Sequence, residues 1–180
     1  VVINDSANHA SIFDGCLLSG ADVRIFPHGN LDYLKKILSK LDDSQSGRLI
    51  ITDGVFSMSG ETAQLDEIYE LAKFYKARVM VDDAHGVGIV GETGRGTAEK
   101  YDLLGKIDLN VGMLSKSPAG LGGYCAASRE VVQYLRLYAR TYFFSTALPA
   151  SVAGGLNEVF KLLETDNAGR KQLWENTEYL

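Results

Sequence analysis

The chain has 180 residues, of which 46% are hydrophobic and 23% are charged, and its formal net charge is −5. This is the balance of an ordinary globular protein, and the length suffices for one domain with a sizeable core. The negative charge and the lack of a Lys/Arg-rich run argue against nucleic-acid binding, and the longest apolar runs are too short for membrane insertion. Cys16 and Cys125 have neither paired nor metal-type spacing, which is typical of free thiols in a reducing, cytoplasmic compartment.

Short apolar runs alternate with segments of helical period along the chain. We expect strands at 1–5, 22–26, 48–52, 78–82, 107–114 and 122–128, and helices at 8–19, 31–41, 65–75, 129–140 and 149–164. This alternation favours an α/β fold, with a mainly parallel sheet and helices on both faces. The first strand and the last helical pattern are cut off at the chain ends, so we expect a piece of a longer protein.

Polar or Gly-rich stretches follow four of the expected strands. Ligands of parallel sheets bind beyond the carboxyl ends of the strands, which directs attention to residues 5–9, 53–59, 82–88 and 115–123. In "VMVDDAHGVG", Asp82 ends a buried strand and His85 follows three residues later. A carboxylate there needs a partner, and a protonated ring nitrogen of a cofactor would serve, with His85 at an oxygen of the same ring. A capping Asp82 and a structural His85 fit this spacing equally well.

Lys116 stands in "LSKSPAGLGG", after another expected strand. We expect lost hydration at the end of an interior strand to lower the pKa of Lys116 and make its neutral amine accessible. Lysines that form a Schiff base with pyridoxal phosphate (PLP) use this property, together with an Asp at the pyridine nitrogen. A lysine that simply reaches solvent is the alternative.

Three further residues have the right position and chemistry for a ligand site. Ser57 in "TDGVFSMSG" can face a ring substituent or a phosphate, His9 can stack on a flat ring, and Thr146 in "FFST" precedes a helix start, which suits phosphate. Each of them also has a simpler interpretation as a turn or capping residue. The chain has no metal-type His/Cys spacing, no hydrolase elbow, no P-loop and no dinucleotide motif.

Taken together, these segments resemble the α-oxoamine synthases. The resemblance rests on "NHASIFDG", "TDGVFSMSG", "VMVDDAHGVGIVGETGRG", "LSKSPAGLGGY" and "YFFSTALPAS", and it covers essentially the whole chain. It implies the large domain of the aspartate-aminotransferase fold (fold-type I), with PLP as cofactor. The family includes amino-oxononanoate synthase, 2-amino-3-ketobutyrate CoA ligase and serine palmitoyltransferase. We expect the helix from about 149 to lead toward a small C-terminal domain outside this chain.

The resemblance also implies roles for individual residues. Lys116 would bind PLP as a Schiff base, Asp82 would pair with the ring nitrogen and His85 with the phenolic oxygen. Ser57 would contact the same side of the ring, and His9 would stack on it near the substrate. Thr146 would reach the phosphate of the neighbouring subunit's cofactor, which implies a homodimer with shared active sites.

Two positions depart from the family pattern. Met113 stands where the family usually has a Thr whose hydroxyl contacts the phosphate, and a thioether cannot donate a hydrogen bond. Ser115 or Ser117 is then the expected donor, or PLP binds more weakly. Pro118 is also unusual so close to the lysine.

The function implied is the condensation of a small amino acid with an acyl-CoA, giving an α-oxoamine, CoA and usually CO2. The residues of the motifs "TDGVFSM" and "VMVDD" resemble most the oxononanoate synthase and ketobutyrate ligase branches, which favours glycine or alanine as the amino acid. A fold-type I aminotransferase, a non-catalytic partner subunit and a plain α/β binding module are the alternatives.

Overall fold

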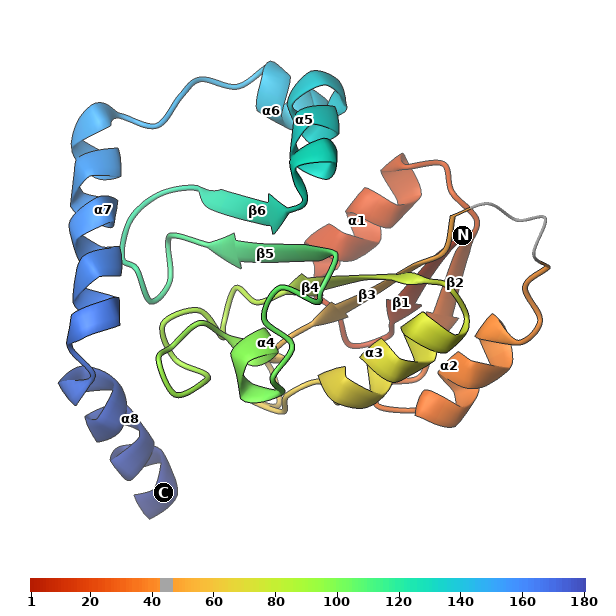
Figure 1. Ribbon diagram of the computed structural model, residues 1–180, viewed down its shortest axis with the longest axis horizontal. Helices are drawn as coiled ribbons and strands as arrows, with labels where there is room; N and C mark the ends of the chain where they lie inside the picture. Colours follow the sequence, from red (N-terminus) through yellow and green to blue (C-terminus); the bar gives the residue numbers. More distant parts are fainter. Residues whose placement is uncertain (43–46) are drawn as a thin grey trace.

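The computed structural model describes residues 1–42 and 47–180. A six-stranded sheet, in the order β2-β1-β3-β4-β5-β6, has helices on both faces (Figure 1). Its strands are β1 (Val2–Asp5), β2 (Val23–Phe26), β3 (Leu49–Asp53), β4 (Arg78–Asp82), β5 (Leu109–Met113) and β6 (Gly123–Ala127). The helices are α1 (Ala10–Leu18), α2 (Leu31–Leu38), α3 (Leu65–Phe74), α4 (Thr97–Lys100), α5 (Arg129–Tyr138), α6 (Arg140–Phe143), α7 (Ala150–Thr165) and α8 (Ala168–Tyr179).

The predicted mainly parallel sheet is confirmed. All neighbours from β2 to β5 run parallel, and β6 alone pairs antiparallel, with β5. Residues 114–122 connect these two strands without a helix, and a parallel pair would need a longer crossover. The short connection therefore turns the chain straight back, and it contains Lys116.

Side chains alternate between two cores on the two faces of the sheet. Ile50 of β3 and Val79 of β4 belong to the larger core, which α2 and α3 cover. Their neighbours Ile51 and Met80 pack on the opposite face, in the smaller core that includes Ile12 of α1. Figure 1 shows the same division, with α1 across the sheet from α2, α3 and α4. Because side chains along a strand alternate between the two faces of the sheet, this alternation determines which side chains at the strand ends lie on the same face.

The C-terminal third leaves large apolar side chains uncovered. They lie on α5, on α6 and in the segment that follows: Tyr134, Leu137, Tyr138, Tyr142, Phe143, Phe144 and Leu148. In Figure 1, α7 then runs past the end of β5, and α8 continues away from the sheet. Across residues 1–42 and 47–180, no helix has the length and apolar character that crossing a membrane requires.

Candidate active site

A cavity of about 340 Å³ opens at the carboxyl ends of β3, β4 and β5. This volume lies in the roughly 300–1,000 Å³ range of small-molecule sites. The residues around it are His9, Ser11, Asp53, Val55, Ser57, Asp82, Ala84, His85, Met113 and Lys116. Five of the seven residues predicted from the sequence are among them, and they come from four separate stretches of the chain.

The parallel register brings the acidic side of the cavity together. Asp82, the last residue of β4, pairs with Asp53 of β3 on one side and with Val111 of β5 on the other. Its Oδ1 accepts a hydrogen bond of 3.0 Å from the backbone N–H of Ala84. That contact shapes the turn toward His85, which reaches the same cavity.

Lys116 lies at the cavity, but its side chain is exposed, whereas the sequence predicts that it is buried. β5 ends at Met113, so Lys116 stands three residues beyond the strand, in the turn that leads to β6. In the described chain its side chain is exposed, because it belongs to this turn and not to an interior strand. The prediction of a desolvated lysine at a strand end is therefore wrong, although the predicted position beside Asp82 and His85 holds.

The N-terminus of α1 brings His9 to the same cavity. His9 is the N-cap of the helix, and its Nδ1 accepts a hydrogen bond from the backbone N–H of Ser11 at 3.3 Å. The Ser11 hydroxyl lies 2.8 Å from the same nitrogen. These contacts fix the ring's orientation at the cavity, so the simpler capping interpretation and a ligand-binding role apply to His9 at once.

Asp53 is the cavity residue to which the sequence assigned no role. It is only 5% exposed. Burial raises the pKa of Asp53 to about 6, and the charge of Asp82 adds to this effect. A hydrogen bond from His9 and the charge of Lys116 lower the pKa but do not outweigh burial. The only sequence signal for it is a carboxylate at a strand end, which Asp82 shares.

The basic residues of the cavity are free to meet a ligand. Burial lowers the pKa of His85, and the charge of Lys116 lowers it further, so the imidazole is neutral at neutral pH. Within the described residues, neither the amine of Lys116 nor the ring of His85 forms a hydrogen bond or ion pair. A neutral ring and an unpaired amine can each bind an incoming group without first breaking a contact.

Ser115 and Thr146 lie outside the lining of this cavity, so their roles remain predictions. Ser115 is exposed beside Lys116, and Thr146 is exposed between α6 and α7. Ser117, the other expected donor, lies against Gly88 and lines a separate cavity with α7 and α8. Met113 lines the main cavity, where the family pattern has Thr.

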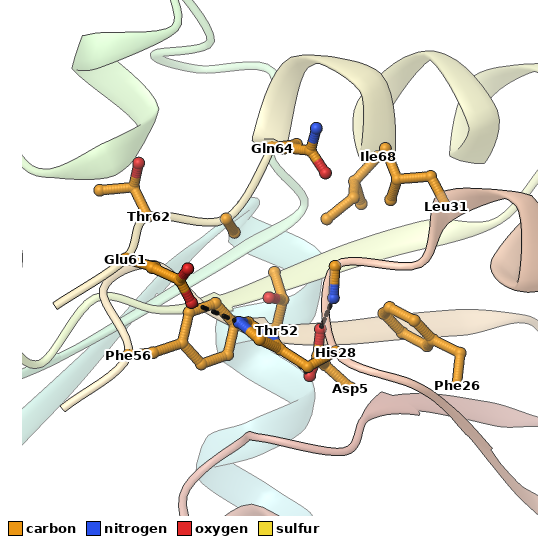
Figure 2. Close-up of a pocket in the computed structure, with 12 residues that line it drawn as sticks. Asp5, Phe26, His28, Leu31, Thr52, Phe56, Glu61, Thr62, Gln64 and Ile68 are labelled. Atoms are coloured by element: carbon orange, nitrogen blue, oxygen red, sulfur yellow. Dashed lines mark hydrogen bonds and ion pairs between the residues drawn. The ribbon is translucent and has the colours of Figure 1, made fainter. Parts of the chain in front are cut away.

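A second polar cluster lines a separate cavity, which Figure 2 shows. His28, which follows β2, has Nδ1 at 3.0 Å from Asp5 Oδ1 and Nε2 at 3.1 Å from Glu61 Oε2. The ring packs edge-on against Phe56. The sequence did not predict this cluster, because its members come from three segments that only the fold brings together.

Known proteins resemble the chain throughout its length. The family model for aminotransferase class I and II matches residues 1–180. The chain belongs to the aminotransferase class I and II family. An 8-amino-7-oxononanoate synthase from Thermoanaerobacter pseudethanolicus is 45% identical over 179 residues, which are 99% of this chain and 45% of that protein.

Solved structures of serine palmitoyltransferase resemble this aminotransferase-family chain closely. The Sphingomonas wittichii enzyme has a TM-score of 0.92 and 37% identity, and the match covers 97% of this chain and 44% of that one. A serine palmitoyltransferase structure that contains PLP has the same TM-score, the same coverage and 38% identity. Both groups of relatives are α-oxoamine synthases, so the resemblance seen in the sequence is confirmed. The chain spans less than half the length of these relatives.

Proposed function

We propose that the protein is a PLP-dependent acyltransferase, to which this chain contributes the cofactor-binding large domain. It condenses a small amino acid, with glycine or alanine favoured, with an acyl-CoA, and it releases an α-oxoamine, CoA and usually CO2. The observation that carries this proposal is the convergence of Lys116, Asp82, His85 and His9 on one cavity, in a chain whose relatives include an 8-amino-7-oxononanoate synthase.

The residues of the cavity fit the ring and the aldehyde of PLP. The cofactor needs an amine for its aldehyde, a carboxylate for its ring nitrogen and a hydrogen-bond donor for its phenolic oxygen. Lys116, Asp82 and His85 supply these three groups, and all three lie at the same cavity. His9 adds a flat ring for stacking, and Ser57 a hydroxyl.

The chemistry divides between the cofactor and the side chains. When bound, PLP supplies an electron-withdrawing ring that stabilises negative charge at the α-carbon of the amino acid. Asp82 holds a proton at the ring nitrogen, which keeps the ring a strong electron acceptor. Lys116 would hold the cofactor through its aldehyde, and the amine of Lys116 would accept the α-proton of the amino acid. His85 orients the ring, since its neutral imidazole donates a hydrogen bond to the phenolic oxygen.

We also propose a homodimer with shared active sites, in which Thr146 reaches the partner's cofactor. The uncovered aromatic and aliphatic side chains of α5 and α6 support this proposal, because apolar surface of this extent marks an interaction site. Relatives of about twice the length support a further small domain after α7. The free thiols of Cys16 and Cys125 support a cytoplasmic location.

The visible absorbance of the full-length protein tests the cofactor role. PLP bound to Lys116 should give an absorbance band that borohydride abolishes, and the reduced protein should carry the label on Lys116. Lys116→Ala should lose the band, whereas the matched control Lys106→Ala, at an exposed lysine away from the cavity, should keep it. A wild-type protein that takes up no PLP would contradict the proposal.

A thiol assay for released CoA then tests the reaction. Glycine, alanine and serine are each combined with short and long acyl-CoAs, and release of CoA with formation of an α-oxoamine is expected for a small amino acid. Transfer of the amino group to a 2-oxo acid without CoA release would instead identify an aminotransferase.

A further inference from the structure

Two carboxylates, not one, stand at the floor of the candidate site. Asp53 ends β3 and Asp82 ends β4, and the two residues are direct partners in the parallel ladder. Asp82 follows Val81 of the large core, and the alternation along the strands puts Asp53 on the same face as Ile51 and Asp82 on the same face as Met80. Both line the cavity. The proposed function uses Asp82 and leaves Asp53 without a role.

Asp53 and Asn8 tie the turn before α1 to the end of β3. The backbone N–H of His9 donates to Asp53 Oδ2 at 3.1 Å, and the backbone N–H of Asp53 donates to Asn8 Oδ1 at 2.7 Å. The amide nitrogen of Asn8 in turn donates to the backbone oxygen of Ile51 at 2.9 Å. These reciprocal bonds join two segments that are 45 residues apart in the chain, and they fix the backbone from which the His9 ring projects.

The second oxygen of Asp53 has no partner. Oδ1 is buried and forms no hydrogen bond with any described residue, although a buried carboxylate oxygen is costly to leave unpaired. A purely structural cap would need only Oδ2. An unpaired buried oxygen at a ligand cavity indicates that the side chain also serves the ligand.

We propose that Asp53 is a positioning residue of the site, which holds His9 against the end of β3 and presents a free oxygen to the bound ligand beside Asp82. This inference rests on the proposed function, because the ligand meant is PLP with its amino acid. Asp53 acts on the cofactor both through His9, which lines the same cavity, and through its own free oxygen. It makes no covalent bond in the reaction.

A double-mutant cycle on PLP affinity in the full-length protein tests this role. Asp53→Ala and His9→Ala should each raise the dissociation constant for PLP by roughly tenfold, the loss expected for one hydrogen bond to a charged group. The double variant should lose less affinity than the product of the two single losses, because both changes disturb the same stacked ring, although Asp53→Ala also removes the oxygen that faces the ligand. Losses that multiply would overturn the proposal, as would an unchanged affinity in Asp53→Ala.

Two further measurements separate positioning from general damage. In PLP-free protein, the imidazole NMR signals of His9 should shift in Asp53→Ala and stay unchanged in Asp14→Asn, a control at an exposed carboxylate of α1. If Asp53→Ala fails to fold, the cycle is run with Asp53→Asn, which keeps an oxygen acceptor for His9. A smaller but still non-additive loss, roughly threefold, is then expected, and an additive loss would count against the proposal. A wild type without PLP binding would overturn the proposed function itself, whereas normal PLP binding with additive losses would overturn only the role of Asp53.

Discussion

Thr97 donates two hydrogen bonds to the buried carboxylate of Asp83, one from its backbone N–H and one from its hydroxyl, each 2.5 Å long. Gly54, Gly86 and Gly96 surround this carboxylate so closely that a Cβ atom on any of them would collide with its oxygens. The contact ties the end of the loop 83–96 to its first residue, Asp83. The "DDAHG" and "GRG" parts of the motif therefore form one structural unit. Their glycines leave space for the Asp83 carboxylate, and this carboxylate holds the loop that contains His85.

Removal of this carboxylate should destabilise the protein. Asp83→Ala loses two charge-assisted hydrogen bonds and leaves Thr97 donors buried without a partner, so we expect the free energy of unfolding to fall by roughly 2–4 kcal/mol. Thr97→Val removes only the hydroxyl and should cost roughly 1–2 kcal/mol. Urea unfolding of the full-length variants measures both values. Equal losses in the two variants would contradict this account.

The pH dependence of stability should carry the signature of Asp53. Its pKa is raised from 3.8 to about 6 in the folded protein, so between these values the folded state binds more protons than the unfolded state. Stability contributed by neutral Asp53 is therefore lost as the pH rises across this window, by about 3 kcal/mol in total. Asp53→Asn cannot ionise and should remove this part of the slope in urea unfolding measured from about pH 4 to about pH 7. An identical slope in the variant and the wild type would show that Asp53 does not titrate there.

Much of the fold follows from local pattern. Continuous apolar runs such as 48–52 and 78–82 indicate interior strands, and helical stripes indicate α2 and α3, so the α/β class and the edge that bears the site could be predicted. The antiparallel β6 was not predicted as such, because apolar pattern carries no direction. The direction of β6 follows from the short connection 114–122, which has no room for the crossover that a parallel strand would need.

The missing parts of the site depend on register and on long-range contacts. Nothing local distinguishes Asp53 from a turn residue, and only the pairing of β3 with β4 places it opposite Asp82. The opposite applies to Lys116: its place at the site was predicted, but its exposure was not, because it lies in the turn after β5 and not in the interior of the sheet. Strand order and strand ends are set by tertiary packing, which one sequence does not reveal.

His28 should act as a pH-dependent link between β1 and the loop that bears Ser57. Both ring nitrogens face carboxylates, of Asp5 and Glu61 (Figure 2), and only the imidazolium can donate to both. Burial lowers the pKa of His28, but these hydrogen bonds outweigh burial and the pKa is raised above 6.5. The added stability is therefore present below about pH 6.5 and is lost as the pH rises through the folded-state pKa.

The comparison of His28→Gln with the wild type checks this link. The wild type should lose stability in urea unfolding between about pH 6 and about pH 8, and His28→Gln should lose less over the same range. Glu61→Gln removes one of the two carboxylate partners and should lie between them. Since His28 is partly exposed, we expect the difference to shrink in high salt. A wild type and a His28→Gln variant with parallel pH profiles would exclude the link.

Met113 should limit the affinity for PLP. Its thioether lines the cavity of Lys116 and cannot donate a hydrogen bond, and Ser117 lies at a different cavity. Met113→Thr places a hydroxyl where the α-oxoamine synthases usually have one, and it should lower the dissociation constant for PLP by roughly 10-fold or more, in line with 1.5–3 kcal/mol for a hydrogen bond to a charged group. Met58→Thr, at a side chain that is 98% exposed, is the matched control and should leave the affinity unchanged. Fluorescence titration of the PLP-free, full-length proteins measures all three constants. An affinity that stays the same or falls in Met113→Thr would mean that the cofactor's phosphate lies away from this position and that its donors come from elsewhere in the protein.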